Sequence, residues 1–497
     1  MKQFDLTTSL IELSGEASEA SHWTIGNAVE GVQIFGGIGS GKSSGSGRMI
    51  ALKYLQAGFG GLVLTVKPDE KETWEEYCEL TGRSGDLIIV EPGRKNLFNF
   101  IDYESQDGGL TENIVQVLKT VIRASEDKES GGADSQFWEM ALDMLIFNVI
   151  DLCKLAYGDL SLQRIFDIVQ TLPTPETAQL EKPTAFKIAF AAASHKVSQA
   201  IETWENKMSI EAVAALRENG TYDEALKNKI PEARIMDAID NFFWGTFLNL
   251  NDKTRSIIEF SFSGFLFRLL RDPIYSLFCR YKCTYTPDDC LQGKIILLNL
   301  PVKTHHKIGR DCQIMFKYIW QRAMEKRNVK ENNRPVFLWA DEAQNFLHEH
   351  DADYQATARS SKIATVYISQ NLPNYHANMG GSKSEYRVKA FLGTLNTKIF
   401  HANADIETNR YASELIGDGS YEETSRTVSA AGEFSSSNTR SHKIDRLIRP
   451  EAFIRLKTGG DLNNGTVEGY LHLQGNPIKD GFNHIKIQFN QNYMSDP

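Results

Sequence analysis

The chain has 497 residues, of which 41% are hydrophobic, so it can bury one large core or several smaller ones. Its net charge of -10 excludes a generally basic surface that coats nucleic acid, but allows a channel lined locally by Lys and Arg. No apolar run approaches the roughly 18 to 20 residues of a membrane helix, and the N-terminus lacks a signal sequence, so we expect a cytoplasmic chain without a membrane span.

The first hundred residues have the pattern of an α/β protein. Short strands and turns are expected over residues 1–30, then a buried strand over Val32–Phe35 and a helix that begins at Ser43. Short apolar runs bounded by turn residues predict further strands within Gly60–Glu70 and Asp86–Gly93. Because a helical stretch separates these two runs, we expect a parallel sheet built by crossovers.

The pattern becomes mostly helical from about residue 110 to 255, and Phe137–Tyr157 has a broad apolar face typical of a buried helix. Prolines within Thr171–Thr184 predict a linker between helices. Strand patterns then return in four runs: Gly293–Val302, Arg334–Phe346, Lys362–Asn371 and Asn396–Asp405. A Ser, Thr, Gly and Glu-rich stretch over 417–441 predicts a loop or a mobile hairpin.

Residues 36–43, GGIGSGKS, fit the G-x-x-x-x-G-K-S pattern between an expected strand and an expected helix. Glycines let backbone N–H groups turn toward phosphates, Lys42 reaches the β and γ oxygens, and the Ser43 hydroxyl binds Mg²⁺. The sequence therefore predicts a site for ATP and Mg²⁺, and we expect Gly45 and Gly47 to allow close packing of the following helix. The predicted nucleotide-binding residues are Gly36, Gly37, Gly39, Ser40, Gly41, Lys42, Ser43 and Ser44.

A second set of polar residues follows the later strands. Asp341 and Glu342 end the apolar run PVFLWA, and we predict that Asp341 holds Mg²⁺ with Ser43 while Glu342 polarises the attacking water. Gln370 follows the next strand and could sense the γ-phosphate, and Arg359 could reach a phosphate in an adjacent subunit. The simpler alternatives are helix capping for Asp341 and Gln370 and a surface salt bridge for Arg359.

Two clusters are candidates for other metal sites. Cys279, Cys283 and Cys290 lack a matching second pair or histidines at ligand spacing, so we expect ordinary thiols. HEHDAD, residues 348–353, lacks the H-E-x-x-H spacing and is expected to be an exposed turn.

Several segments together resemble a known family, the type IV secretion coupling proteins, which are the TraG/TraD-like branch of the HerA/FtsK ATPases. The resemblance covers about residues 30–475. The segments that carry it, in chain order, are GGIGSGKS (36–43), DSQFWEMAL (134–142), GKIILLNLP (293–301), FLWADEAQNF (337–346), ARSSKIATVYISQN (358–371) and KIFHANADIETNRYASELIGD (398–418).

This resemblance implies a fold and an assembly. The expected fold is an α/β RecA-like P-loop NTPase domain, formed by residues 1–105 and 256–497 and interrupted by an all-helical inserted domain over 106–255. The family assembles rings, usually hexamers, that pump DNA. In these proteins a trans-acting arginine matches Arg359 and a phosphate-sensing glutamine matches Gln370, and Arg410 is a second candidate for the subunit interface.

Three functions remain open from the sequence. The first is a ring ATPase that delivers single- or double-stranded DNA, with a bound relaxase, to a secretion channel in conjugative transfer. The second is a soluble HerA-like motor that powers a partner nuclease in DNA processing or phage defence, and the third is a protein-secretion ATPase or a nucleotide-gated scaffold. Conjugative members commonly carry N-terminal membrane helices, so we expect recruitment to the inner membrane by a partner, a role elsewhere, or a truncated chain.

Overall fold

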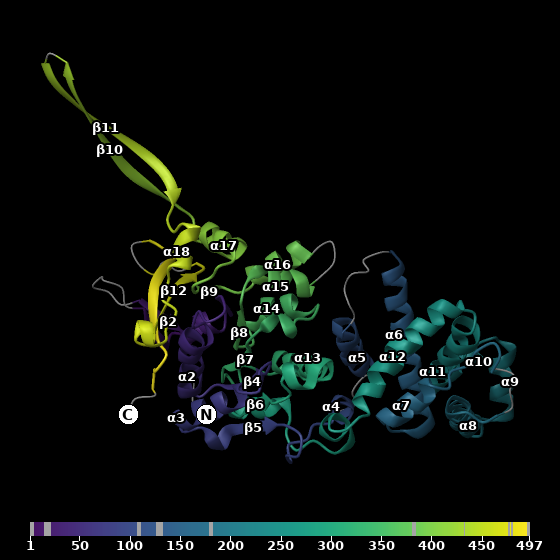
Figure 1. The fold of residues 1–497 in the computed structure, drawn as a ribbon. Helices are drawn as coiled ribbons and strands as arrows, with labels where there is room; N and C mark the ends of the chain where they lie inside the picture. Colours follow the sequence, from purple (N-terminus) through teal and green to yellow (C-terminus); the bar gives the residue numbers. More distant parts are fainter. Residues whose placement is uncertain are drawn as a thin grey trace. The chain divides into compact units, whose positions relative to one another are not determined.

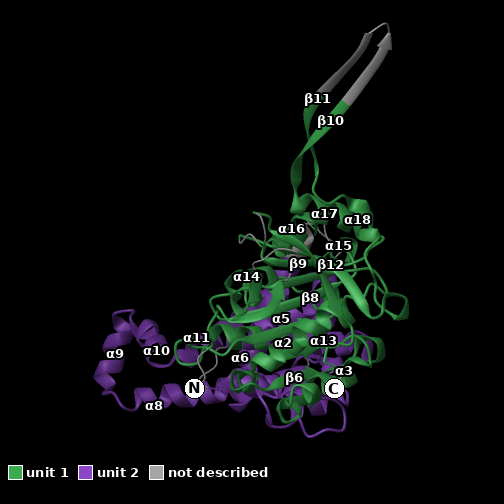
Figure 2. Ribbon diagram, turned by 90° about the vertical axis from the view of Figure 1, so that its left-hand side faces the viewer, with its two compact units in different colours: residues 1–89, 287–304, 320–497 green, residues 90–286, 305–319 purple. Residues whose placement is uncertain are grey.

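The computed structural model forms two compact units, which are coloured separately in Figure 2. Unit 1 comprises residues 1–89, 287–304 and 320–497, and unit 2 comprises residues 90–286 and 305–319. The expected limits of the inserted domain, 106 and 255, stay a prediction, because compactness alone does not define an independent domain. The structure describes residues 4–13, 21–106, 111–125, 133–177, 182–379, 384–431, 433–475, 478 and 481–494.

A nine-stranded sheet forms the centre of unit 1, with the strand order β13-β12-β9-β3-β8-β7-β4-β6-β5 (Figure 1). The six strands from β9 to β6 are parallel, whereas β12 is antiparallel to both β9 and β13. The strands are β3 (Val32–Phe35), β4 (Gly60–Leu64), β5 (Leu87–Val90), β6 (Ile295–Leu298), β7 (Val336–Ala340), β8 (Ile363–Ser369), β9 (Thr397–Phe400), β12 (Thr466–Leu473) and β13 (His484–Asn490).

The register aligns the carboxyl ends of the central strands at one edge of the sheet. Phe35 of β3 lies opposite both Ser369 of β8 and Phe400 of β9, and Leu64 of β4 lies opposite Ala340 of β7. Every residue of β3, β4, β7, β8 and β9 is buried, as expected for parallel strands covered on both faces. The residues that follow these strands are therefore brought together at one edge.

Helices cover both faces of the sheet. On one face α2 (Arg48–Ala57) and α3 (Glu70–Leu80) share a core with strand residues such as Val63, Phe337 and Trp339. On the other face Tyr367 contacts Phe391 of α16 and the hydroxyl of Tyr375 of α15 donates to Gln33. The helices named here are α14 (Asp351–Ala358), α15 (Leu372–Met379) and α16 (Ser384–Gly393), and Tyr367 also donates to Asp351 of α14.

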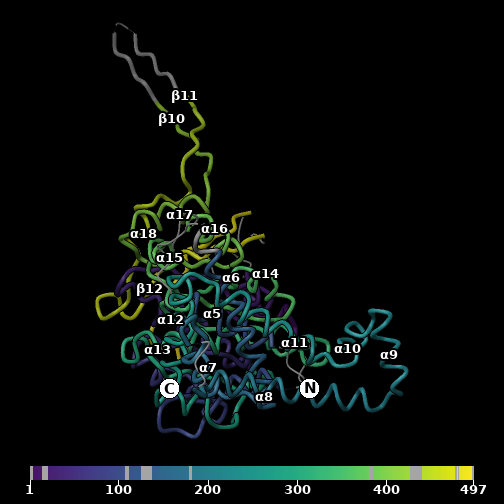
Figure 3. The backbone as a smooth tube through the Cα atoms, turned by 90° about the vertical axis from the view of Figure 1, so that its right-hand side faces the viewer, coloured from purple at the N-terminus to yellow at the C-terminus, as the bar shows by residue number. Residues whose placement is uncertain are grey.

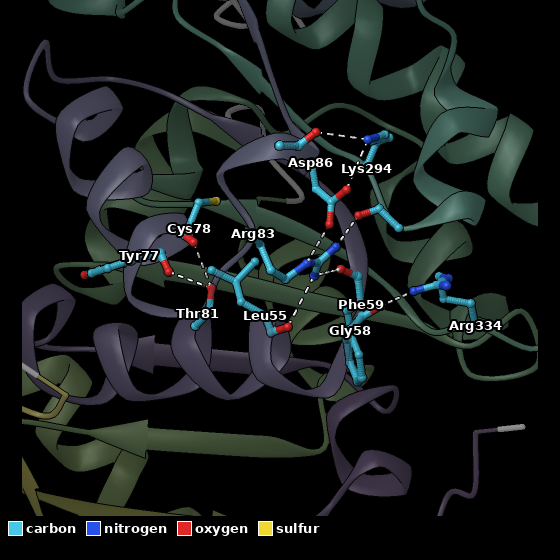
Figure 4. Close-up of polar contacts among 12 residues, drawn as sticks. Leu55, Gly58, Phe59, Tyr77, Cys78, Thr81, Arg83, Asp86, Lys294 and Arg334 are labelled. Carbon is cyan, nitrogen blue, oxygen red and sulfur yellow. Dashed lines mark hydrogen bonds and ion pairs between the residues drawn. The ribbon is translucent and has the colours of Figure 1, made fainter. Parts of the chain in front are cut away.

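A half-buried arginine links the amino ends of the strands at the opposite edge of the sheet. The guanidinium of Arg83 donates to the carbonyl oxygens of Leu55 and Phe59, at 3.3 and 2.6 Å, and to that of Gly293 (Figure 4). Asp86 accepts from both Arg83 and Lys294. These bonds hold the residues that precede β4, β5 and β6. They fix the amino ends of these strands, at the edge of the sheet opposite the site.

Smaller elements complete unit 1. The hairpin of β10 (Asp418–Ala431) and β11 (Glu433–Arg446) projects away from the sheet in both views (Figures 1 and 3), which confirms a hairpin in the region expected to be a loop or hairpin. Its tip residue 432 and the side chains of 426–438 lie outside the described residues. The other elements are β1 (Ser9–Leu13), β2 (Ser21–Thr24), α1 (Ile25–Ala28), α17 (Ile406–Ile416) and α18 (Pro450–Ile454).

Unit 2 is helical in all its described regular elements, as the sequence pattern predicts. Aromatic side chains form part of its core, with Phe186 4.8 Å from Phe243 between ring centroids. Phe137–Tyr157 lies within α6, and helices flank the predicted linker 171–184, of which 178–181 lie outside the described residues. Its helices are α4 (Phe100–Ser105), α5 (Thr111–Ser125), α6 (Ala133–Tyr157), α7 (Leu162–Val169), α8 (Ala185–Glu205), α9 (Ile210–Glu218), α10 (Tyr222–Lys229), α11 (Pro231–Asp240) and α12 (Asp252–Leu269).

The element α13 (Val302–Lys326), which is kinked at His306 (φ 52°, ψ -140°), contributes residues to both units. Its central residues, 305–319, belong to unit 2, and its ends belong to unit 1. In the parts of the chain that the structure describes, no helix is both long and apolar enough to cross a lipid bilayer.

Candidate nucleotide site

The phosphate loop lies between β3 and the helix α2. Gly39 and Gly41 have φ angles of 71° and 79°, in the left-handed region that favours glycine. A Cβ atom at Gly36 would clash with the Ser40 hydroxyl, and one at Gly41 would clash with the Val467 side chain. The loop conformation is therefore accessible only with glycine at these positions, which explains the spacing seen in the sequence.

The expected helix does not begin as an α-helix. Ser43–Gly47 form a π-helical turn, and the α-helix α2 begins at Arg48. A Cβ atom at Gly45 would lie 3.0 Å from the Cβ of Val467, and one at Gly47 would lie 3.0 Å from the Lys42 carbonyl oxygen. The prediction that these two glycines allow close packing is confirmed.

The acidic pair after β7 faces the loop. The Ser43 hydroxyl donates to Asp341 Oδ2 over 2.6 Å, and Lys42 Nζ lies 4.0 Å from Glu342 Oε1. Lys42, Asp341 and Glu342 are each only 7% exposed, so little water screens their charges. The structure thus brings together the two predicted Mg²⁺ ligands, Ser43 and Asp341. The ion pair of Lys42 and Glu342 lies beside them.

Amide side chains hold both oxygens of Glu342. Gln370 donates to Oε1 over 3.1 Å and Gln344 donates to Oε2 over 2.8 Å. Ser369 in turn donates to the Gln344 oxygen over 2.9 Å. Glu342 itself has a left-handed backbone, with φ 51° and ψ 49°, which is uncommon for a residue with a side chain. The carboxylate is thereby fixed in orientation.

A pocket of about 530 Å³ opens beside these groups. Such a volume falls in the range of small-molecule and cofactor sites. Its lining includes Lys42, Glu342 and Gln370 from the prediction, together with Lys67 and Lys303. Ser44, which was also predicted to bind nucleotide, is exposed. Its hydroxyl accepts a hydrogen bond from the Gln491 side chain.

Arg359 lies at the opposite edge of the sheet. It follows α14 and precedes β8, whereas Gln370 follows β8, so the seven-residue strand separates the two by about 20 Å. Its guanidinium pairs with Glu30 at 3.2 Å and its side chain is 69% exposed. Arg359 is therefore placed away from the phosphate loop of its own chain. Arg410, in α17, is exposed.

Three residues beside the loop were not among the predicted site residues. Lys67 follows β4, His401 follows β9, and Gln344 lies two residues after Glu342. The signal that could have found Lys67 and His401 is their position, since each directly follows an apolar run predicted to be a parallel strand. Gln344 had only its proximity to the acidic pair as a signal.

The expectation of an exposed turn for the HEHDAD stretch holds only in part. Residues 349–350 form a turn and Glu349 is exposed, but His348 is 6% exposed and Asp351, the first residue of α14, is 1% exposed. Gln321 bonds both side chains: its amide oxygen accepts from His348 Nε2 at 3.0 Å and its amide nitrogen donates to Asp351 at 2.9 Å. The buried Asp351 carboxylate also accepts hydrogen bonds from the His348 backbone N–H and from the Tyr367 hydroxyl of β8.

The geometry of the loop fits a nucleotide with Mg²⁺. Ser43 and Asp341 place a hydroxyl and a carboxylate oxygen within hydrogen-bond distance, and Mg²⁺ prefers few protein oxygens together with phosphates and water. The buried Ser40 hydroxyl lacks a hydrogen-bond partner among the described residues, as expected for a group that faces a ligand. No group of three or more His, Cys, Asp and Glu side chains suited to a metal occurs among the described residues.

A phosphate loop after β3 and an acidic pair after β7, at one edge of a mainly parallel sheet, define a RecA-like P-loop NTPase fold. The expected fold class is confirmed. Residues 335–458 match the sequence model of a family described as the TraM recognition site of TraD and TraG. A comparison with curated proteins by sequence found no match.

Solved structures of bacterial conjugative coupling proteins have the same fold. The plasmid coupling protein TrwB in complex with the GTP analogue GDPNP aligns with 99% of this chain and 90% of its own, at 12% identity and a TM-score of 0.61. TrwB in complex with ADP and Mg²⁺ aligns with 94% of this chain and 86% of its own, at 12% identity and a TM-score of 0.58. Together with the family match, these structures confirm the resemblance to the TraG/TraD-like coupling proteins.

Proposed function

We propose that this chain is a ring-forming ATPase that couples ATP hydrolysis to DNA translocation, as a type IV coupling protein that delivers relaxase-bound DNA in conjugative transfer. One observation carries the enzymatic part: the phosphate loop, the acidic pair and Gln370 meet around one pocket at one edge of the sheet. The DNA-transfer part is supported by the family match and by the shared fold with TrwB, which is described as a conjugative coupling protein.

Each residue of the pocket has a defined chemical task. The loop N–H groups and Lys42 bind the β- and γ-phosphates, and Glu342 orients and polarises the water that attacks the γ-phosphate. When bound, Mg²⁺ neutralises charge on the phosphates and orients them for in-line attack. Gln370 donates to Glu342, so it can report the presence of the γ-phosphate through that same carboxylate.

Oligomerisation belongs to this proposal because the strand β8 separates Arg359 from Gln370, which lines the pocket, by about 20 Å. We infer that it completes the site of a neighbouring subunit in a ring, with six subunits as the expected number. The proposed partners are DNA and a relaxosome protein of the TraM kind, supported by the description of the family that matches residues 335–458. We expect secretion-channel proteins to recruit the chain to the inner membrane.

The test is the steady-state ATPase rate of the purified chain with and without single- and double-stranded DNA, measured together with its mass in solution. We expect DNA to stimulate hydrolysis and to favour the ring. Lys42→Ala should abolish hydrolysis and keep the wild-type thermal unfolding temperature, since the Lys42 side chain lines the pocket. Hydrolysis that no DNA alters would reject translocation of DNA in favour of protein transport, and an active Lys42→Ala chain would reject the site.

A further inference from the structure

A second lysine approaches the acidic pair from the side opposite the phosphate loop. Lys67 follows β4, which neighbours β7 on one side, whereas β8 and then β3 with the loop lie on the other. Lys67 Nζ is 3.9 Å from Asp341 Oδ2, the same oxygen that accepts the Ser43 hydroxyl. The oxygen predicted to hold Mg²⁺ therefore has a cation beside it.

The backbone at Lys67 is held while its side chain remains accessible. Glu70 accepts hydrogen bonds from the backbone N–H groups of Val66 and Lys67, at 2.7 and 3.3 Å, and the Val66 carbonyl accepts from the Lys303 N–H at 3.1 Å. The Lys67 side chain is 35% exposed, compared with 9% for Lys42. A flexible four-carbon stem thus projects from a fixed base into the pocket.

Lys67 is a cation at neutral pH, because the ordinary pKa of a lysine is about 10.4. A lysine cation and Mg²⁺ repel each other, so both cannot stay beside Asp341 Oδ2 at low cost. The other anionic groups expected in the pocket are the phosphates of the nucleotide.

We propose that Lys67 is a second phosphate-binding lysine that exchanges partners: it neutralises Asp341 in the nucleotide-free chain and moves to the terminal phosphate when Mg²⁺ and ATP bind. This inference rests on the proposed nucleotide site. It makes Lys67 a residue that distinguishes ATP from ADP, because only ATP offers the γ-phosphate, and it makes the ammonium group a competitor of Mg²⁺ at Asp341.

The test compares wild type, Lys67→Met and Lys67→Arg in equilibrium binding of fluorescent ATP and ADP analogues, at a series of Mg²⁺ concentrations. Loss of one charged hydrogen bond should reduce the preference for ATP over ADP about 10-fold in Lys67→Met. The Mg²⁺ concentration needed for half-maximal ADP binding should fall in the same variant. Lys67→Arg should keep much of the ATP preference, because it keeps the charge.

Lys389→Met is the matched control, since Lys389 pairs with Glu385 on α16 and its side chain is 66% exposed. It should bind both analogues as wild type does. A Lys67→Met chain with the wild-type ATP preference, or with an unchanged Mg²⁺ requirement, would overturn the partner exchange. If instead wild type bound neither analogue, the nucleotide site itself would be wrong, which separates failure of the proposed function from failure of this inference.

Discussion

At the scale of single residues, neighbouring amide groups fix the orientation of the Glu342 carboxylate. Gln370 and Gln344 each donate to a different oxygen of Glu342, so neither oxygen is free to rotate away. The left-handed backbone of Glu342 adds local strain that the surrounding bonds must offset. Such fixed orientation is what a general base requires, because proton transfer depends first on geometry.

We predict that Glu342→Gln separates binding from hydrolysis. Lys42 and Ser43 remain, so nucleotide affinity should stay within a few-fold of wild type, while hydrolysis should fall at least about 100-fold through loss of the base. Single-turnover hydrolysis and equilibrium nucleotide binding measure the two effects separately. Glu349→Gln, which removes a carboxylate that is 44% exposed, should leave both unchanged. Loss of binding together with hydrolysis would contradict the assigned role.

At the scale of elements, His401 joins three parts of unit 1. It follows β9, its Nδ1 lies 2.8 Å from the carbonyl oxygen of Glu468 in β12, and its Nε2 lies 2.7 Å from the Ser46 hydroxyl in the π-helical turn. A carbonyl oxygen only accepts, so Nδ1 carries the hydrogen and Nε2 of the neutral ring accepts from Ser46. Burial, and then the charge of Lys42, lower the pKa of His401 to about 4.

This lowered pKa predicts how stability changes with pH. Between pH 6.5 and 4 the unfolded chain protonates His401 and the folded chain does not, so the free energy of unfolding falls as pH falls through that window. The loss amounts to at most about 1.4 kcal/mol per pH unit. We expect the thermal unfolding temperature to drop between pH 7 and pH 5, and to drop less in His401→Gln.

His442→Gln, on the exposed hairpin, is the control and should show the wild-type drop. His472 of β12 also has a pKa lowered to about 4, mainly by burial, so His401→Gln should reduce the pH effect without removing it. An equal fall in the thermal unfolding temperature of wild type and His401→Gln would contradict this prediction. It would show that His401 takes up no proton on unfolding between pH 7 and pH 5.

At the scale of the whole molecule, the distance between Arg359 and its own loop has a consequence for assembly. If Arg359 acts on a phosphate, it acts across a subunit boundary, and each working site then needs Lys42 and Glu342 from one chain and Arg359 from another. Its exposed side chain, paired only with Glu30 among the ion pairs of the described residues, is placed to do so. Exposed ion pairs of this kind contribute little stability, so its removal should not unfold the chain.

Mixing variants tests this arrangement. Arg359→Ala and Glu342→Gln should each have strongly reduced ATPase activity alone, and mixed rings should regain activity above either, because some sites combine an intact Glu342 with an intact Arg359. Mixing Glu342→Gln with Lys42→Ala should regain nothing, since both lesions fall in the same half of the site. An inactive Arg359→Ala and Glu342→Gln mixture, with subunit exchange verified by mass, would assign Arg359 a structural role.

The sequence alone predicted the features that depend on contiguous residues. Short apolar runs such as Val32–Phe35 and Val336–Ala340 are strands because β-structure buried on both faces needs uninterrupted hydrophobic residues. The glycines of the loop, with Lys42 and Ser43, are recognisable because their spacing follows directly from the backbone turn around a phosphate. Asp341 and Glu342 were found by the same logic, as a polar pair that ends a buried strand.

Only the tertiary structure decided which distant residues meet. Strand order puts β4 beside β7, and so brings Lys67 to Asp341 across 274 positions of sequence, and the pairing of β9 with β12 fixes His401 beside Ser46. The same three-dimensional packing buries His348 and Asp351, and separates Arg359 from Gln370 by the length of one strand. Local pattern determines what each segment becomes, whereas pairing and register between segments far apart in the chain determine what its side chains touch.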